Sequence, residues 1–211
     1  MARNALTIGT DSVPGRSFKV NIQPNPNQHE VLHVFNYFKP LGISYAGQPL
    51  WIRAEPALER IFLAHKNSIL IHLSADRQEN YYPWQRFEAI IQSLPNERFV
   101  VTYAPKEVDA ARTIASNVNA IALDTDIPEF IALVGLCKLA ISPDGGAIHF
   151  ATARKTPVIS LFGSKENASR WFPWGNQHLS IASQTGLARD IDPQEILRKI
   201  STVNICLEHV D

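Results

Sequence analysis

One loop of the sequence combines residue types that bind anionic ligands. Residues 142–149 read Ser-Pro-Asp-Gly-Gly-Ala-Ile-His and connect a predicted strand to a predicted helix. Gly145 and Gly146 allow a ligand to approach the backbone closely, and the free N–H groups of the new helix favour an anion. His149, in the first turn, can donate a hydrogen bond to a phosphate or sugar oxygen. The alternative interpretation is that Asp144 only caps the helix and His149 only packs.

Three other loops that follow predicted strands carry polar side chains. Ser74 and Arg77 follow the first of these strands, and the arginine can donate to a diphosphate. Glu107 follows the second strand and can accept hydrogen bonds from ribose hydroxyls. Asp126 follows the third, where the loop can line a base pocket. Each has an ordinary alternative: an exposed loop residue for Arg77, a first-turn acid for Glu107 and a helix cap for Asp126.

Strands that alternate with helices are expected to position these loops. Apolar runs predict strands at residues 68–73, 98–103, 120–123, 139–142 and 157–162. Helices are predicted at residues 83–94, 106–116, 128–136, 146–154 and 192–200. This alternation favours a parallel α/β sheet covered on both faces, with ligands at the carboxyl ends of the strands. We predict a doubly wound, Rossmann-like domain at residues 49–190, and a C-terminal helix and tail at residues 191–211.

The first 48 residues do not continue this pattern. Two short strand-like runs, at residues 5–9 and 17–22, are separated by the turn-forming pair Pro14-Gly15. A helix is predicted at residues 29–38. Two strands and one helix are too little for an independent domain. We therefore interpret residues 1–48 as the last part of another domain with the helix that joins the two.

The composition favours a globular protein and argues against several classes. Hydrophobic residues make up 45% of the 211 residues, and 20 Lys+Arg balance 20 Asp+Glu, so no nucleic-acid partner is expected. The first residues lack the apolar run of a signal peptide, and no segment approaches the ~20 apolar residues of a membrane span. We expect a cytoplasmic protein, and leave open a peripheral contact with the inner membrane. Cys137 and Cys206 lack the spacing of a zinc site or a disulfide framework, which suits a reducing compartment.

Several segments, taken together, resemble one protein family. The most specific is Asp144–His149, followed by an Ala-rich turn and a Pro-Val strand that ends in Phe-Gly, over residues 151–163. Arg-Trp-Phe-Pro-Trp-Gly at residues 170–175 comes next. Weaker segments match in the same order at residues 29–31, 104–107 and 128–129. The set resembles the signature of glycosyltransferase family 9, which includes the lipopolysaccharide heptosyltransferases, and it covers nearly the whole chain.

The resemblance implies a glycosyltransferase with a GT-B fold, in which two Rossmann-like domains face a cleft and the C-terminal one binds a nucleotide-sugar. The implied donor is ADP-heptose and the implied acceptor is the core of lipopolysaccharide or a related glycan; no tightly bound cofactor or metal is implied. Glu107 is implied to hold the adenosine ribose, and Asp126 to line the base pocket. Helix N–H groups and nearby cations stabilise the charge of the departing diphosphate. The residues implied to hold the diphosphate and the sugar are Asp144, Gly145, Gly146 and His149.

Two departures from the family pattern limit what the resemblance implies. The family carries a lysine in the loop where this chain has Asn80, so Arg77 becomes the candidate for the missing charge. Only residues 1–48 resemble the N-terminal domain, which in the family holds the acceptor and the carboxylate proposed as general base. No catalytic residue is therefore assigned, and most of that domain is expected to be absent or supplied by a second chain. The alternative to a transferase is a module that binds ADP or an ADP-sugar and transfers nothing.

Overall fold

The computed structural model describes residues 6–10, 18–23, 25 and 27–207 of the chain. The chain divides into two compact units. The first consists of Met1–Gln48 with Ser169–Trp171, and the second of Pro49–Ala168 with Phe172–Asp211. The second unit contains every loop to which the sequence assigned a ligand-binding residue.

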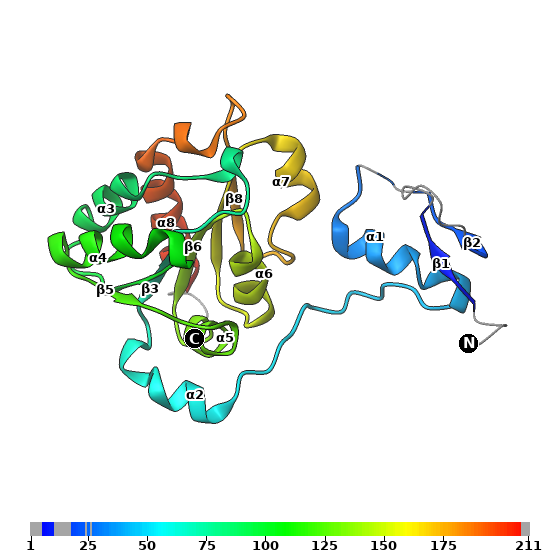
Figure 1. Ribbon diagram of the computed structural model, residues 1–211, viewed down its shortest axis with the longest axis horizontal. Coiled ribbons are helices and arrows are strands. Elements are labelled where there is room, and N and C mark those ends of the chain that lie inside the picture. The colour runs from blue at the N-terminus through cyan, green and yellow to red at the C-terminus, as the bar shows by residue number, and fades with distance from the viewer. Residues whose placement is uncertain (1–5, 11–17, 24, 26, 208–211) are drawn as a thin grey trace. The chain divides into compact units, whose positions relative to one another are not determined.

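The second unit is built on a six-stranded sheet with the order β5-β4-β3-β6-β7-β8, and every neighbouring pair is parallel (Figure 1). This order runs outward from β3 in one direction and from β6 in the other, which is the doubly wound, Rossmann-like arrangement expected from the sequence. The five predicted strands are confirmed to within a residue or two at their ends, and β8 was not predicted. The strands are β3 (Ile69–His72), β4 (Phe99–Thr102), β5 (Ala120–Leu123), β6 (Leu139–Pro143), β7 (Val158–Phe162) and β8 (Leu179–Ala182).

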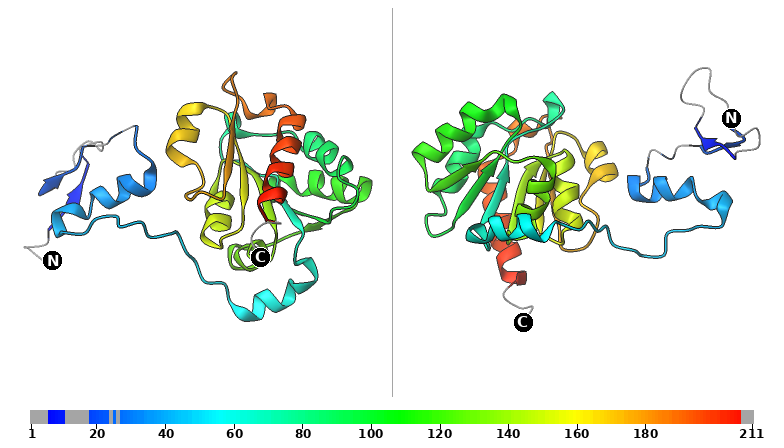
Figure 2. Two further views of the ribbon diagram at one scale, coloured as in Figure 1. Left: turned by 180° about the vertical axis from the view of Figure 1, so that it is seen from behind. Right: turned by 60° about the horizontal axis from the view of Figure 1, so that its bottom comes forward.

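Helices cover both faces of this sheet (Figure 2). One face carries α3 (Trp84–Gln92), α4 (Val108–Asn117) and α8 (Pro193–Leu207). The other carries α5 (Ile127–Val134) and α6 (Gly146–Ala153), and α2 (Pro56–Ile61) packs against α5. Sequence analysis missed α2 and α7 (Lys165–Trp171). Short 3-10 helices complete the chain: η1 (Lys39–Leu41), η2 (Leu63–His65), η3 (Gln78–Asn80), η4 (Pro105–Glu107) and η5 (Ala188–Asp190).

The central strands β3, β4, β6 and β7 are mostly apolar because both faces of the sheet are buried there. Neighbouring residues of a strand point to opposite faces. Ile69 and Ile71 of β3 belong to the core cluster that contains Phe87 of α3 and Ile114 of α4, and Leu70, between them on the other face, is also fully buried. A sheet held from both sides gives the loops at its carboxyl edge a rigid base.

The first unit is small. Its strands β1 (Ile8–Gly9) and β2 (Val20–Asn21) pair in parallel, and α1 (Glu30–Asn36) follows them. Both strands are shorter than the predicted runs, whose first residues, 5 and 17, lie outside the described residues together with the Pro14-Gly15 turn. His29 caps α1, since its Nδ1 accepts a hydrogen bond from the Val31 N–H at 3.1 Å.

Gly163, the residue after β7, marks a close approach of three chain segments. A Cβ atom at this position would lie 2.5 Å from the Glu79 carbonyl oxygen and 2.8 Å from that of Gly186. Both obstacles are backbone atoms, which cannot move without displacing their loops. The loop after β3, the end of β7 and the loop after β8 therefore meet at a point where only glycine fits.

We predict that Gly163→Ala destabilises the protein by about 1–3 kcal/mol, because the added methyl forces the backbone of two loops apart. Urea unfolding followed by circular dichroism measures the difference. Gly146→Ala is the matched control: its Cβ would come no closer than 3.8 Å to Phe150, and alanine suits a helix better than glycine. Equal stability of the two variants would show that the loops are not packed as described.

Candidate functional site

The strand order of the sheet changes direction between β3 and β6. In an open α/β sheet, the crevice that takes a ligand lies at this switch point, outside the carboxyl ends of the strands. The loop that follows β3 contains Ser74, Arg77 and Asn80. The loop that follows β6 contains Asp144 and Gly145, and leads into α6. The two loops singled out most strongly by the sequence are thus the pair that flanks the switch point.

A hydrogen bond joins these two loops. The side-chain amide Nδ2 of Asn80 donates to Oδ2 of Asp144 at 2.9 Å. At its other end, Asn80 Oδ1 accepts from the backbone N–H of Gly163, also at 2.9 Å. The Asn80 side chain is 1% exposed, so it acts as an internal link between the loops after β3, β6 and β7.

The N-terminus of α6 lies immediately beside this link. Gly145 is the N-cap residue, so no side chain at the cap position covers the first N–H groups of the helix. A Cβ atom at Gly145 would meet nothing within 4 Å, which means that the space in front of it is open. His149 is half-buried in the first turn of the same helix. Helix N–H groups without a side-chain cap, with a histidine in the same turn, are suited to an anion such as a phosphate.

Asp144 does not cap α6, which excludes that alternative for its side chain. Burial raises the pKa of the Asp144 carboxyl from the usual 3.8 to about 6. The Asn80 hydrogen bond and the charge of Arg77 oppose this increase in pKa, and the charges of Asp76 and Glu79 add to it. The carboxyl therefore changes its protonation state close to neutral pH. Arg77 is largely exposed and lies 3.8 Å from Glu79, with which it forms a surface ion pair.

The raised pKa predicts a pH-dependent stability difference between the wild type and Asp144→Asn. Because the folded-state pKa lies above the unfolded one, the stabilisation from protonated Asp144 is complete below about pH 3.8 and is lost as the pH rises through about 6. The asparagine does not titrate and keeps an oxygen that can accept from Asn80. Urea unfolding at several pH values should show Asp144→Asn gaining stability relative to the wild type as the pH rises from 4 to 7. A constant difference over that range would contradict the burial of the carboxyl.

A second group of predicted residues lies together at the ends of β3 and β4. Ser74 Oγ accepts from the Ala104 N–H and donates to Glu107 Oε2, each at 2.6 Å. Lys106 Nζ lies 3.4 Å from Glu107 Oε1 and donates to the Ala75 carbonyl at 2.9 Å. These bonds tie the two loops together and fix the Glu107 carboxylate, which helps to line a cavity of about 280 Å³ with Lys106, Tyr81, Tyr82 and Trp84 among its walls. Ser74 thus positions Glu107, in addition to any contact with a ligand.

We predict that Ser74→Ala destabilises the protein by roughly 1–3 kcal/mol, because it leaves the Ala104 N–H and the Glu107 carboxylate without their shared hydroxyl. Ser93→Ala is the matched control: this exposed hydroxyl bonds only to the Ala89 carbonyl one turn back, so the loss should stay within about 0.5 kcal/mol. Chemical denaturation of both variants tests the difference. Similar values would mean that the Ser74 bonds contribute little.

The Asp126 side chain caps a helix, as the alternative interpretation of the sequence predicted. Its carboxylate accepts from the Glu129 N–H at 2.8 Å, while Glu129 Oε2 accepts from the Asp126 N–H at 3.0 Å. This reciprocal capping box starts α5. The Asp126 side chain is exposed and is already engaged within its own helix, so its part in a base pocket stays a prediction that concerns the loop more than the carboxylate.

His72, the last residue of β3, does not add positive charge to this edge. Its Nδ1 lies 3.0 Å from Thr102 Oγ1, and its ring packs edge-on against Phe130. Burial lowers the pKa of His72 to about 4, with a small opposing effect of Asp76. The ring is therefore neutral at physiological pH. Arg77, after β3, and Lys106, after β4, are cations at this edge, and they supplement the partial positive charge of the α6 N-terminus.

Sequence reasoning missed the role of Asn80. It identified the residue only as a departure from the family's lysine. The hydrogen-bond partners of Asn80 are 64 and 83 residues away along the chain, so no local pattern could reveal them. The aromatic residues Tyr81 and Trp84 beside Glu107 were missed for the same reason.

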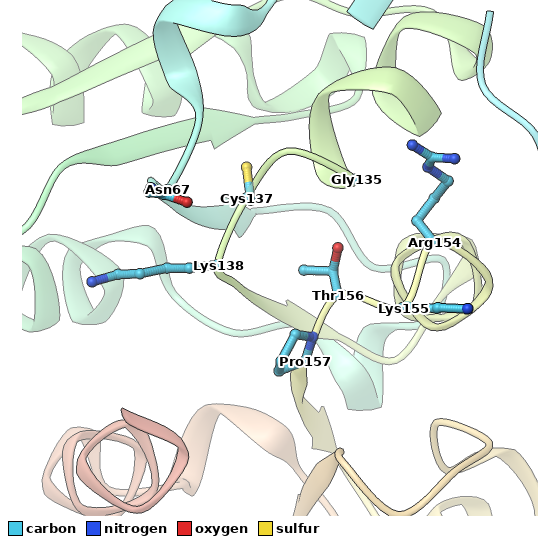
Figure 3. Close-up of a pocket in the computed structure, with 8 residues that line it drawn as sticks. All are labelled: Asn67, Gly135, Cys137, Lys138, Arg154, Lys155, Thr156 and Pro157. Carbon is cyan, nitrogen blue, oxygen red and sulfur yellow. The ribbon is translucent and has the colours of Figure 1, made fainter. Parts of the chain in front are cut away.

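A larger cavity, of about 550 Å³, lies at the opposite, amino edge of the sheet (Figure 3). Its walls include residues that directly precede β6 and β7. Three cationic side chains contribute, but Figure 3 shows Lys138, Arg154 and Lys155 pointing away from one another. Lys138 is paired with Glu97 at 2.6 Å, and Arg154 is paired with Glu59. Burial raises the pKa of Cys137, in the same wall, to about 12, so its thiol is unreactive. None of the predicted ligand-binding residues lies here.

The described residues meet neither the requirements of a metal site nor those of a membrane-spanning helix. Within the described residues, no three His, Cys, Asp or Glu side chains are grouped as a metal site would require. No helix of the described part of the chain is both long and apolar enough to cross a membrane.

Comparison with known proteins identifies a family and relatives. The family described as "Glycosyltransferase family 9 (heptosyltransferase)" matches residues 19–201. A lipopolysaccharide heptosyltransferase 3 from Escherichia coli is 32% identical over 125 residues, which are 55% of this chain and 36% of that protein. A protein of the same name from Escherichia coli strain K12 is 27% identical over 162 residues, 72% of this chain and 46% of that protein. The chain therefore spans less than half of the length of these curated relatives.

Solved structures agree with the fold. The family 9 glycosyl transferase of Veillonella parvula superposes with a TM-score of 0.77 at 14% identity, covering 88% of this chain and 63% of that one. The Escherichia coli heptosyltransferase WaaC with ADP superposes with a TM-score of 0.71 at 16% identity, covering 88% of this chain and 60% of that one. These likenesses confirm the expected fold class, a doubly wound α/β unit of the kind that makes up GT-B glycosyltransferases.

Proposed function

The chain belongs to glycosyltransferase family 9, and we propose that it supplies the donor-binding half of a heptosyltransferase-like enzyme, with an ADP-sugar, and specifically ADP-heptose, as the donor. The observation that carries this proposal is the position of the Asp144–His149 loop. It follows β6 at the switch point of the sheet, where its glycines lead into an uncapped helix N-terminus. A structural neighbour with this fold was solved with ADP, which supports the choice of nucleotide.

In this proposal the diphosphate of the donor lies against the first turn of α6. The N–H groups that follow Gly145 and the side chain of His149 donate to it, and Arg77 adds charge from the loop after β3. Negative charge grows on the diphosphate as the bond to the sugar breaks. Donors that are already in place stabilise that charge without having to reorganise, which lowers the barrier of the transfer step.

The remaining predicted residues are proposed to hold the rest of the donor. Glu107 accepts hydrogen bonds from the ribose hydroxyls, because Ser74 and Lys106 hold its carboxylate at the cavity between β3 and β4. Asp144 accepts from hydroxyls of the transferred sugar. The loop at Asp126 lines the base pocket. No metal and no tightly bound cofactor take part in this scheme.

The acceptor is proposed to be the core of lipopolysaccharide or a related glycan, from the names of the curated relatives. We assign no general base among residues 49–190. We propose that the base and the acceptor site belong to an N-terminal domain, of which residues 1–48 are the last part, or to a second chain. A cytoplasmic location and a contact with the inner membrane stay predictions from the sequence.

The first test of the donor assignment is a thermal shift of the chain with ADP, UDP and GDP side by side. A nucleotide at ten times its dissociation constant stabilises the folded state by roughly 1.4 kcal/mol, which is readily measured. We expect a shift with ADP that exceeds those with UDP and GDP. His149→Ala should weaken ADP binding about tenfold, the loss of one hydrogen bond to a charged group, and should leave the melting temperature without ligand nearly unchanged.

His65→Ala is the control for this measurement, because His65 lies in η2, which precedes the amino end of β3. It should bind ADP as the wild type does. An equal loss in both variants, or no loss in His149→Ala, would contradict the placement of the diphosphate at α6. A shift by UDP or GDP equal to that by ADP would contradict the choice of an adenine nucleotide.

A further inference from the structure

Asn80 makes two hydrogen bonds of opposite sense, which requires a side chain that donates and accepts at the same time. Its Nδ2 donates to the Asp144 carboxylate and its Oδ1 accepts from the Gly163 N–H. An ionised aspartate at this position can only accept, a lysine can only donate, and a leucine can do neither. Since the side chain is 1% exposed, water cannot replace a partner that is lost.

The surroundings of Asn80 leave it little freedom to turn toward a ligand. The Glu79 carbonyl, one residue earlier, is in tight contact with Gly163. Tyr81, one residue later, lies in the wall of the cavity that contains Glu107. The position that the family pattern gives to a cation is thus occupied here by an internal link between loops.

We propose that Asn80 is a positioning residue of the donor site: it holds the Asp144 carboxylate and the backbone after β7 in a single arrangement beside the N-terminus of α6, and it does not itself bind the donor. This inference rests on the proposed function for its effect on the nucleotide. The link to Asp144, however, can be measured without any nucleotide.

The charges around Asp144 explain why this link affects binding. Arg77 faces it with positive charge, and Asp76 and Glu79 face it with negative charge, all from the loop after β3. His149 lies in the first turn of α6, the helix that begins two residues after Asp144. In Asn80→Asp, a second carboxyl would stand at hydrogen-bond distance from Asp144, and once both members of the pair are ionised they would repel each other and the diphosphate. When the introduced carboxyl is protonated, it has the shape of the native amide and can donate to Asp144 as Asn80 does.

Lowering the pH should therefore restore ADP binding in the same variant. Calorimetric titration of the full chain with ADP should give Asn80→Asp nearly wild-type affinity at about pH 5, and an affinity at least tenfold weaker than wild type at about pH 8. Asn117→Asp is the matched control, since Asn117 also donates to a carboxylate, that of Glu88 at 3.0 Å, but on the exposed surface between α3 and α4. It should follow the wild type at every pH.

A measurement without ligand separates this inference from the proposed function. The carboxyl carbon signal of Asp144, assigned with the Asp144→Asn variant, is followed against pH by NMR in the wild type, Asn80→Asp and Asn117→Asp. A changed titration in Asn80→Asp alone upholds the link, and wild-type protein that then fails to bind ADP overturns the donor assignment. An unchanged Asp144 titration in Asn80→Asp, or ADP affinity that falls equally at both pH values, overturns the positioning role.

Discussion

The order of the strands is the constraint from which the candidate site follows. All six strands of the second unit run in parallel, so the loops that follow the strands, which carry all the predicted ligand-binding residues, lie at the same edge of the sheet. Because the order turns outward on both sides of the β3–β6 pair, the carboxyl ends of these two strands form the switch point at which open α/β sheets bind their ligands. The loop with Asp144 and the loop with Asn80 are the ones that this topology places at the switch point.

Buried polar groups then give this edge a single arrangement. Asn80 joins three loops through two hydrogen bonds, and Ser74 joins two further segments through a hydroxyl that both donates and accepts. A buried polar atom without a partner costs free energy, so each of these bonds also disfavours alternative loop positions. This rigidity suits the proposed function, in which a diphosphate is held while its charge increases, since donors that are already oriented need no reorganisation.

Two kinds of charged group lie at the carboxyl edge of the sheet. The helix N-terminus provides partial positive charge that does not titrate, whereas Asp144, with its pKa raised by burial, titrates near neutral pH. His72, the last residue of β3, is kept neutral by its own burial. In the proposed function, backbone N–H groups and cationic side chains meet the anionic donor, and Asp144 adds a group that responds to pH.

The sequence by itself determined the class of fold and identified the loop that is proposed to hold the diphosphate. Apolar runs alternating with helices were enough to predict five of the six strands of the sheet, because both faces of a parallel sheet are buried and the strands must be apolar throughout. The missed strand, β8, contains the exposed Ser180, which interrupts its apolar run, whereas the other edge strand, β5, reads Ala-Ile-Ala-Leu without a break. The Asp-Gly-Gly-Ala-Ile-His segment was recognisable because its glycines and histidine are close together in sequence.

Only the tertiary structure decided what the individual side chains do. It showed that Asn80, a departure from the family pattern, links loops through its hydrogen bonds. It further showed that Ser74 orients Glu107 and that the Asp126 carboxylate caps a helix. It also showed that Asp144 is not a cap and that burial raises its pKa. The physical reason is that the hydrogen bonds between strand-end loops connect residues that are tens of positions apart in the chain. Burial, which sets both the cost of an unmade bond and the pKa of a carboxyl, exists only once those loops have come together.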